Sequence, residues 1–275
     1  TRPAIPAAAT TAIAAPSLSA VSPAPVSPRA KPWQAAPAGE KRRRASGAAR
    51  RAADIQRRTT TTQNHLAALR NTANIGQRQG AHAESVAGHI RSSPALHPDG
   101  FLVVGTPDGF VRAINLDGRP RWEAQVGASI DGSAAIGDDG TIYIGNDAGF
   151  LIALTPGGGI RWRYETGADI RATPAVFPDG TAIVGSYDQH VYAIRPDGSL
   201  RWRVPTSGRV RSSALLDANG RIYVGSQDDS IYCLSPDGEV LWQHNIGQDV
   251  DATPALGPDG TLFVGADDGR LHALR

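Results

Sequence analysis

The stretch SSPALHPDGFLVVGTPDGFVRAINLDGRPRW, residues 92–122, decides the fold. Its pattern returns without a gap at residues 132–162 as GSAAIGDDGTIYIGNDAGFLIALTPGGGIRW. Two more copies follow at the same period of 40 residues, and a shortened fifth copy follows them. A period of this length indicates one supersecondary unit per copy. The copies span residues 89–128, 129–168, 169–208, 209–248 and 249–275.

Each full copy has the pattern of four short antiparallel strands, and the fifth copy has the first three. A small apolar strand, such as residues 92–96 or 132–136, precedes an Asp-Gly or Asn-Gly turn. The second strand is β-branched and aromatic, the third alternates, and the fourth carries a tryptophan. One such sheet has two apolar faces, which radial stacking of several sheets would cover. The sequence therefore predicts an all-β protein, a β-propeller of four-stranded antiparallel blades.

The tryptophans of the fourth strands recur every 40 residues, and we expect them at the wide rim of the propeller. Small residues of the first strand suit the crowded axis. One indole buries roughly 150–250 Å² when it packs between sheets. We therefore interpret these residues as structural contacts between blades and not as a ligand cage. They are Trp122, Trp162, Trp202 and Trp242.

The repeat quoted above resembles the pyrroloquinoline-quinone-like (PQQ-like) propeller repeat. That family occurs in quinoprotein dehydrogenases, in the outer-membrane barrel assembly lipoprotein and in many uncharacterised bacterial proteins. The resemblance covers residues 89–275. It is specific for the fold but weak for activity, because function resides in sites that the scaffold carries. It implies a bacterial protein of the periplasm, cell envelope or exterior that acts as a protein-interaction or envelope-assembly scaffold.

Quinone-dependent members of this family carry adjacent cysteines, a Ca²⁺ site and a catalytic Asp. Here the single cysteine, Cys233, takes a third-strand position that holds Ala in other copies. Turn acids recur at one position in four of the five copies, as Asp108, Asp188, Asp228 and Asp268 do, which marks them as turn formers. We predict no enzyme activity, no metal and no cofactor, neither PQQ nor Ca²⁺. A degenerate or fragmentary quinoprotein dehydrogenase stays an alternative. A lipoprotein would need an acylated N-terminal cysteine, and Cys233 is not one.

The fifth copy lacks a fourth strand, and the number of blades depends on what completes it. Residues 80–88 stand one period before the first tryptophan-bearing strand, with His82 in the tryptophan position. This register predicts a five-bladed ring that residues 80–88 close. The alternative is an open array that a second chain or further blades would complete.

One candidate site lies at the axis, just before the first strand of each copy. In a closed ring, Asp131 would lie between Arg91 and Arg171, and Asp251 between Arg211 and Arg91. One interpretation is a rim of salt bridges. The other is a cationic notch at Arg171 and Arg211 that holds a carboxylate, phosphate or sugar acid.

A small-ligand or glycan-binding propeller with one pocket per blade is a further alternative. It would need matching residues at equivalent surface positions of the copies. The residues at one such set of positions differ widely, which argues against this alternative. They are Phe110, Phe150, His190, Ser230 and Arg270.

The formal net charge of +2 hides two opposite parts. Residues 1–88 carry 13 Lys and Arg against 3 acids, whereas residues 89–275 carry 15 Arg against 23 acids. We expect residues 1–40 to be an Ala/Pro-rich disordered linker and residues 41–79 a basic, partly helical or disordered segment open to polyanion contact. The propeller would span residues 80–275. No run approaches the roughly 18 apolar residues of a transmembrane helix.

Overall fold

The computed structural model describes residues 89–275. The chain divides into two units, Thr1–Gln56 and Arg57–Arg275, and the described residues belong to the second. Within residues 89–275 the secondary structure consists of β-strands, with no helix. The predictions for the Ala/Pro-rich linker, for the basic segment and for closure by residues 80–88 lie outside the described residues.

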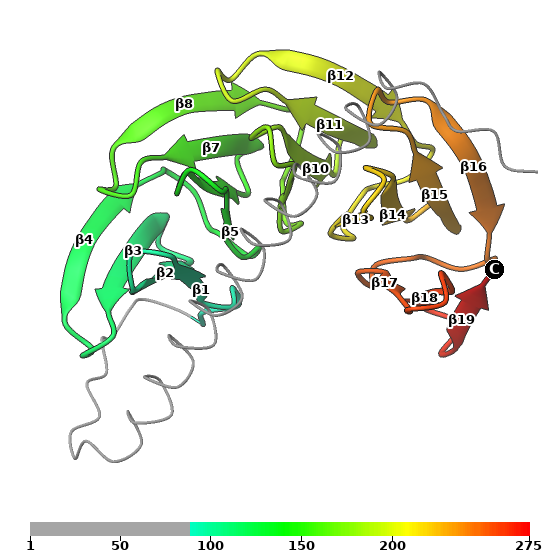
Figure 1. Ribbon diagram of the computed structural model, residues 1–275, viewed down its shortest axis with the longest axis horizontal. Coiled ribbons are helices and arrows are strands. Elements are labelled where there is room, and N and C mark those ends of the chain that lie inside the picture. Colours follow the sequence, from blue (N-terminus) through cyan, green and yellow to red (C-terminus); the bar gives the residue numbers. More distant parts are fainter. Residues whose placement is uncertain (1–88) are drawn as a thin grey trace, which may run out of the picture. The chain divides into compact units, whose positions relative to one another are not determined.

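The strands form five antiparallel sheets in chain order, and each sheet is a meander (Figure 1). Sheet 1 contains β1 (Ala95–His97), β2 (Phe101–Gly105), β3 (Phe110–Asn115) and β4 (Pro120–Gln125). Sheet 2 contains β5 (Ala135–Ile136), β6 (Ile142–Gly145), β7 (Phe150–Leu154) and β8 (Ile160–Glu165). Sheet 3 contains β9 (Ala175–Val176), β10 (Ala182–Ser186), β11 (His190–Ile194) and β12 (Leu200–Pro205). Sheet 4 contains β13 (Leu215–Leu216), β14 (Ile222–Ser226), β15 (Ser230–Leu234) and β16 (Val240–Asn245). Sheet 5 contains β17 (Ala255–Leu256), β18 (Leu262–Gly265) and β19 (Leu271–Leu274).

This arrangement confirms the predicted all-β propeller. In Figure 1 the fourth strands β4, β8, β12 and β16 lie on the outer side of the sheets. The third strand pairs with the fourth in the same register in sheets 1–4, for example Ala113 with Trp122 and Cys233 with Trp242. A register shift follows that pair in all four sheets. Repeated sequence thus gives repeated geometry down to single residue pairs.

The first strands are shorter than the sequence pattern predicts. The pattern of residues 132–136 predicts five strand residues, but β5 holds only Ala135 and Ile136. The preceding residues bond to the neighbouring sheets instead. The backbone N–H of Ser93 donates to Ser133 Oγ at 2.8 Å, and the N–H of Ser133 donates to Thr173 Oγ1 at 3.1 Å. These bonds bring together residues exactly one repeat apart.

The hydrophobic core lies between neighbouring sheets. In sheet 2, Ile144 and Ile152 pack with side chains of sheet 1, among them Val111. On the other face of the same sheet, Tyr143 and Leu151 pack with side chains of sheet 3. Each interior sheet is therefore covered on both faces, and burial between sheets supplies much of its stability.

A glycine at or next to the end of the second strand permits this close packing in sheets 1–4. A Cβ atom built on Gly105 would lie 2.2 Å from Ile130 Cγ2 of the next sheet, and one on Gly145 would lie 2.1 Å from Ile170 Cγ2. No side chain fits at these distances. The recurring glycine is thus explained by contact between sheets.

Sheets 1 and 5 stand at the two ends of the series (Figure 1). Among residues 89–275, no strand pairing and no ion pair joins them. Sheet 5 has three described strands, so the outer edge of β19 has no neighbour among the described strands.

Candidate functional site

The candidate axial residues stand two positions before the residues that bond from sheet to sheet, such as Ser93 and Ser133. Because those bonds hold equivalent residues side by side, charged residues at the preceding positions also meet across neighbouring sheets. Arg91 Nη1 lies 3.0 Å from Asp131 Oδ2, and Arg171 Nη1 lies 3.9 Å from the same oxygen. Asp131 therefore lies between two arginines, one from each neighbouring sheet.

The second acid of the series has one arginine partner. Arg211 Nη1 lies 2.9 Å from Asp251 Oδ2. A closed ring would also bring Arg91 to Asp251, but among residues 89–275 no ion pair joins these two residues. The hydrogen bond to Asp251 is the first cause of the raised pKa of Arg211.

Arg171 is held by two acids that sequence reasoning missed. Its Nε donates to Asp147 Oδ1 at 3.1 Å, and its Nη2 donates to Asp147 Oδ2 at 3.2 Å and to Asp169 Oδ2 at 3.0 Å. Burial raises the pKa of Asp147, although Arg171 opposes this effect. The bidentate pair with Asp147 fixes the orientation of the Arg171 guanidinium.

A third set of neighbours completes the axial surface. Gln227 Nε2 donates to Asp251 Oδ1 at 3.0 Å. Arg171 Cζ lies 5.3 Å from the centre of the Tyr187 ring, and Arg209 Cζ lies 5.4 Å from it, within the range of a cation–π contact. Sequence reasoning could have found Gln227 and Tyr187 from their position. Both stand two residues after the recurring glycine of the second strand, where the copies differ from one another.

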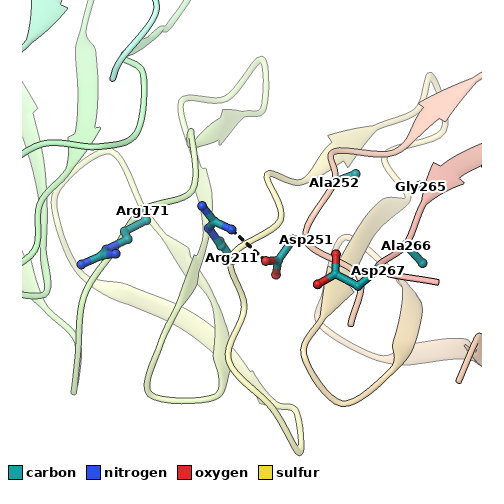
Figure 2. A pocket seen from close by; sticks show the side chains of 7 residues that line it. All are labelled: Arg171, Arg211, Asp251, Ala252, Gly265, Ala266 and Asp267. Atoms are coloured by element: carbon teal, nitrogen blue, oxygen red, sulfur yellow. Dashed lines mark hydrogen bonds and ion pairs between the residues drawn. The ribbon is translucent and has the colours of Figure 1, made fainter. Parts of the chain in front are cut away.

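A pocket of about 490 Å³ opens among these residues (Figure 2). Figure 2 shows the Arg171 side chain directed away from Arg211, while Arg211 turns to Asp251. The two guanidinium groups do not converge on one point, and each already has a carboxylate partner. Asp267 lies beside Asp251 and adds negative charge. The pocket therefore offers charges of both signs. Its lining residues are Arg171, Arg211, Asp251, Ala252, Gly265, Ala266 and Asp267.

One more acidic residue, Asp249, lies near the aspartates of this pocket. Burial is the first cause that raises the pKa of Asp249, and repulsion from Asp251, Asp229 and Asp267 adds to it. The sheet 5 side of the pocket is therefore acidic, while Arg211 makes the sheet 4 side basic. A polypeptide segment carries both kinds of complementary group, whereas a simple anion carries one.

The turn acids have structural partners. Asp108 Oδ2 accepts from Arg112 Nη2 at 2.9 Å, and the hydrogen bond with Arg112 is the first cause of its lowered pKa. Asp188 Oδ2 accepts from the Tyr192 hydroxyl at 2.6 Å and from the backbone N–H of Gly167 in the preceding sheet, also at 2.6 Å. These contacts match the interpretation of the recurring acids as turn residues.

The tryptophans contact the following sheet. The indole N–H of Trp122 donates to the Pro156 carbonyl at 2.9 Å, that of Trp162 to the Pro196 carbonyl at 2.8 Å, and that of Trp202 to the Pro236 carbonyl at 3.0 Å. Trp242 differs, because 37% of its surface is exposed.

The remaining candidates do not form matching surfaces. Of the positions considered for one ligand pocket per blade, Ser230 is buried, Phe110 is half-buried and Arg270 is exposed. Cys233 is buried, and burial raises the pKa of its thiol. Within residues 89–275, no group of three or more His, Cys, Asp or Glu side chains is placed to hold a metal ion. No helix in that part of the chain could span a membrane.

Comparison with known proteins places the repeat in a family. No curated protein sequence matches the chain. The crystal structure of BamB from Moraxella catarrhalis is similar in fold, with a TM-score of 0.60 and 23% sequence identity. The match covers 70% of this chain and 63% of the Moraxella chain, so the matched region is under two thirds of that protein. Residues 107–177, 152–236 and 227–275 match the family described as outer membrane protein assembly factor BamB. The chain therefore belongs to this family of PQQ-like propellers.

Proposed function

We propose that this chain is a non-catalytic propeller of the bacterial cell envelope that binds protein partners in assembly. The observation that carries the proposal is the axial pocket, in which arginines and aspartates from sheets 3, 4 and 5 present both signs of charge. Family membership supports it, because the family description names an assembly factor of the outer membrane.

The chemistry of the pocket favours a polypeptide over a small acid. Arg171 bonds to Asp147 and Asp169, so an anionic ligand would have to displace a carboxylate to reach it. A protein surface can instead extend the existing pairs, with an acid placed beside Arg211 and a base placed beside Asp267. Such complementary pairs give an interface its specificity and register.

The test compares two double variants of the full chain that remove the same charge. Arg171→Gln with Arg211→Gln changes the axial pocket. Arg119→Gln with Arg195→Gln changes two exposed arginines near the turns between third and fourth strands, away from the pocket, and serves as the matched control. Proteins retained from a bacterial envelope extract are purified and titrated against each variant. Thermal unfolding is measured for each variant to check that it is folded.

We expect the control variant to retain the same proteins with unchanged affinity. The axial variant should bind them at least about tenfold more weakly, since each charged hydrogen bond lost at an interface is worth about 1.4 kcal/mol or more. Unchanged affinity of the axial variant, or retention of glycan without protein, would contradict the proposal.

A further inference from the structure

Two turns of the molecule depart from the repeat in their backbone. They connect the second and third strands of sheets 3 and 4. Gln189 and Asp229 stand in these turns with φ angles of 68° and 66°, and among residues 89–275 they are the only residues other than glycine with positive φ. The equivalent residues of sheets 1, 2 and 5 are Gly109, Gly149 and Gly269, which adopt positive φ without strain. Sheets 3 and 4 therefore keep a side chain where the turn geometry favours glycine.

The strain at these two positions is not offset inside the turns. The Gln189 side chain is exposed and the Asp229 side chain is half-buried, and neither bonds to another residue of the described part. Both turns border the axial surface, because Tyr187 and Gln227 precede the strained residues by two positions. Strained residues concentrate where their side chains serve a ligand or a partner. The two side chains are therefore candidates for contacts with a molecule that binds on the axial surface.

The sheet 3 turn also carries a tyrosine that arginines surround. Arg171 Cζ and Arg209 Cζ lie 5.3 Å and 5.4 Å from the centre of the Tyr187 ring. The hydrogen bond to Asp251 and then the proximity of Tyr187 raise the pKa of Arg211, so a third guanidinium lies near the same tyrosine. The Tyr187 hydroxyl is neither buried nor hydrogen-bonded within residues 89–275. The ring is thus held in place, while its hydroxyl is available to a ligand.

One of these arginines differs from the other two in its charge balance. Arg171 and Arg211 are each paired with aspartate. Arg209 is exposed, and its guanidinium contacts the Tyr187 ring but no carboxylate of residues 89–275. A carboxylate beside Arg209 would accept hydrogen bonds from the guanidinium and from the phenol, and charge-assisted bonds of this kind are strong. It would bind without displacing an existing ion pair.

The amides of the two turns suit a polypeptide around that carboxylate. Gln227 Nε2 donates to Asp251 Oδ1 at 3.0 Å, which leaves its carbonyl oxygen as an acceptor. The exposed amide of Gln189 offers both donors and an acceptor. The backbone of a polypeptide supplies matching N–H and C=O groups, whereas an ionised small acid supplies acceptors only. The surroundings therefore favour an acidic residue within a chain over a free acid.

We propose that the second-to-third-strand turns of sheets 3 and 4 form a recognition surface for an acidic residue of a partner polypeptide. The carboxylate of the partner would bind between Arg209 and the Tyr187 hydroxyl, and the amides of Gln189 and Gln227 would bind the backbone beside it. Asp229 would disfavour a second acid next to it. This inference rests on the proposed function, in which the axial surface binds proteins, and it names the group that the surface recognises.

A titration of the full chain tests the tyrosine contact directly. The chain is produced with 3-fluorotyrosine, and fluorine NMR follows its six tyrosines. Tyr187→Phe identifies the signal of Tyr187 by its absence. The probe is the peptide acetyl-Gly-Glu-Gly-amide. The same peptide with Gln in place of Glu is the neutral control, and acetate is the free-acid control. Arg209→Gln alters the surface, and Arg195→Gln is the matched control, an exposed arginine of another turn.

We expect the Glu peptide to shift the Tyr187 signal with saturable binding. The Gln peptide and acetate should bind at least about tenfold more weakly, and so should the Glu peptide with Arg209→Gln. Arg195→Gln should leave the affinity unchanged. Gln189→Gly gives a second readout. Glycine relieves the backbone strain, so the unfolding midpoint should rise, while the affinity for the Glu peptide should fall about threefold or more.

Several results would overturn the proposal. They are a Tyr187 signal that does not respond, equal binding of the Gln peptide or acetate, and affinity that Arg209→Gln does not change. A Gln189→Gly variant that is more stable but binds as before would show that Gln189 only shapes its turn. A lower midpoint of that variant would contradict the strain argument.

The titration needs no envelope protein, so its outcome is separate from that of the proposed function. Envelope proteins that bind through Arg171 and Arg211, together with a silent Tyr187 signal, would overturn this inference alone. A peptide that binds as expected, with no envelope protein that depends on the two arginines, would contradict the proposed function alone.

Discussion

Sheets 1–4 and sheet 5 carry the same repeat but differ in how far their neighbours cover them. One third-strand position shows the contrast. Leu271 of sheet 5 is 73% exposed, while its equivalents in sheets 1–4 are 0% exposed; these are Val111, Leu151, Val191 and Ile231. The side chains are chemically alike, so the difference comes from the neighbouring sheet. Burial in this fold is therefore a property of the interface between sheets and not of the single repeat.

The largest effect should come from truncating this position. Leu151→Ala removes a fully buried side chain between sheets 2 and 3, and we expect a loss of about 3 kcal/mol in the free energy of unfolding. Leu271→Ala should cost less than about 0.5 kcal/mol, since its side chain is mostly in water. Urea denaturation of the full chain measures both. Equal losses would show that the two leucines are covered alike.

Glycines at the ends of the second strands give the next largest contrast. A methyl group at Gly145 would clash with Ile170, so Gly145→Ala should destabilise the protein by about 2 kcal/mol. At Gly265 the nearest atom to an added Cβ is Ala252 Cβ at 3.6 Å, an ordinary contact. Gly265→Ala should therefore leave the unfolding midpoint unchanged or raise it slightly. A matching loss at Gly265 would break the comparison.

Tryptophan-to-phenylalanine variants test the polar part of the interface. Trp162→Phe removes the donor to the Pro196 carbonyl, and we expect a loss of about 1 kcal/mol in stability. Trp242→Phe should have little effect on stability, because no described carbonyl accepts its indole N–H. Chemical denaturation of both variants, with unmodified chain as reference, checks the difference. The expectation fails if Trp242→Phe is the more damaging change.

The smallest expected effects concern two turn acids, Asp108 in sheet 1 and Asp268 in sheet 5, whose hydrogen-bond partners lie in their own sheets. Hydrogen bonds, first that with Arg112, lower the pKa of Asp108. For Asp268, burial would raise the pKa, but hydrogen bonds from Arg270 and His272 bring it below its usual value. A lowered folded pKa adds stability above the unfolded pKa, and that stability is lost as pH falls through the folded value.

Both acids should therefore contribute to acid destabilisation, in sheet 1 and in sheet 5 alike. Asp108→Asn and Asp268→Asn should each flatten the decline of the unfolding midpoint between neutral pH and about pH 3. Thermal unfolding across this range measures the slopes. If only Asp108→Asn flattened the decline of the unfolding midpoint, the expectation would be wrong. The hydrogen bonds of Asp268 would then depend on a neighbouring sheet.

The sequence predicted the sheets because the repeat shows its strands, turns and glycines five times over. The first strands were predicted too long, since hydrogen bonds such as that from Ser93 to Ser133 run between sheets and have no signature in strand propensity. The meeting of Asp131 with Arg91 and Arg171 could be expected, because residues one repeat apart become neighbours.

The rest of the axial site could not be predicted in the same way. Arg171 meets Asp147 across 24 residues, from the end of one sheet's second strand to the start of the next sheet's first strand. That offset depends on how far neighbouring sheets are rotated, which periodicity does not reveal. The direction of the Arg171 side chain, away from Arg211, follows from the same pairing.

Amide hydrogen exchange of the full chain, read by mass spectrometry, tests most directly whether neighbouring sheets protect one another. We predict that peptides from β14 and β15 of sheet 4 exchange at least about tenfold more slowly than peptides from β18 and β19 of sheet 5, because exchange reports local opening. Equal protection of the two sheets would contradict the central claim, since sheet 5 would then be stable without a covering neighbour.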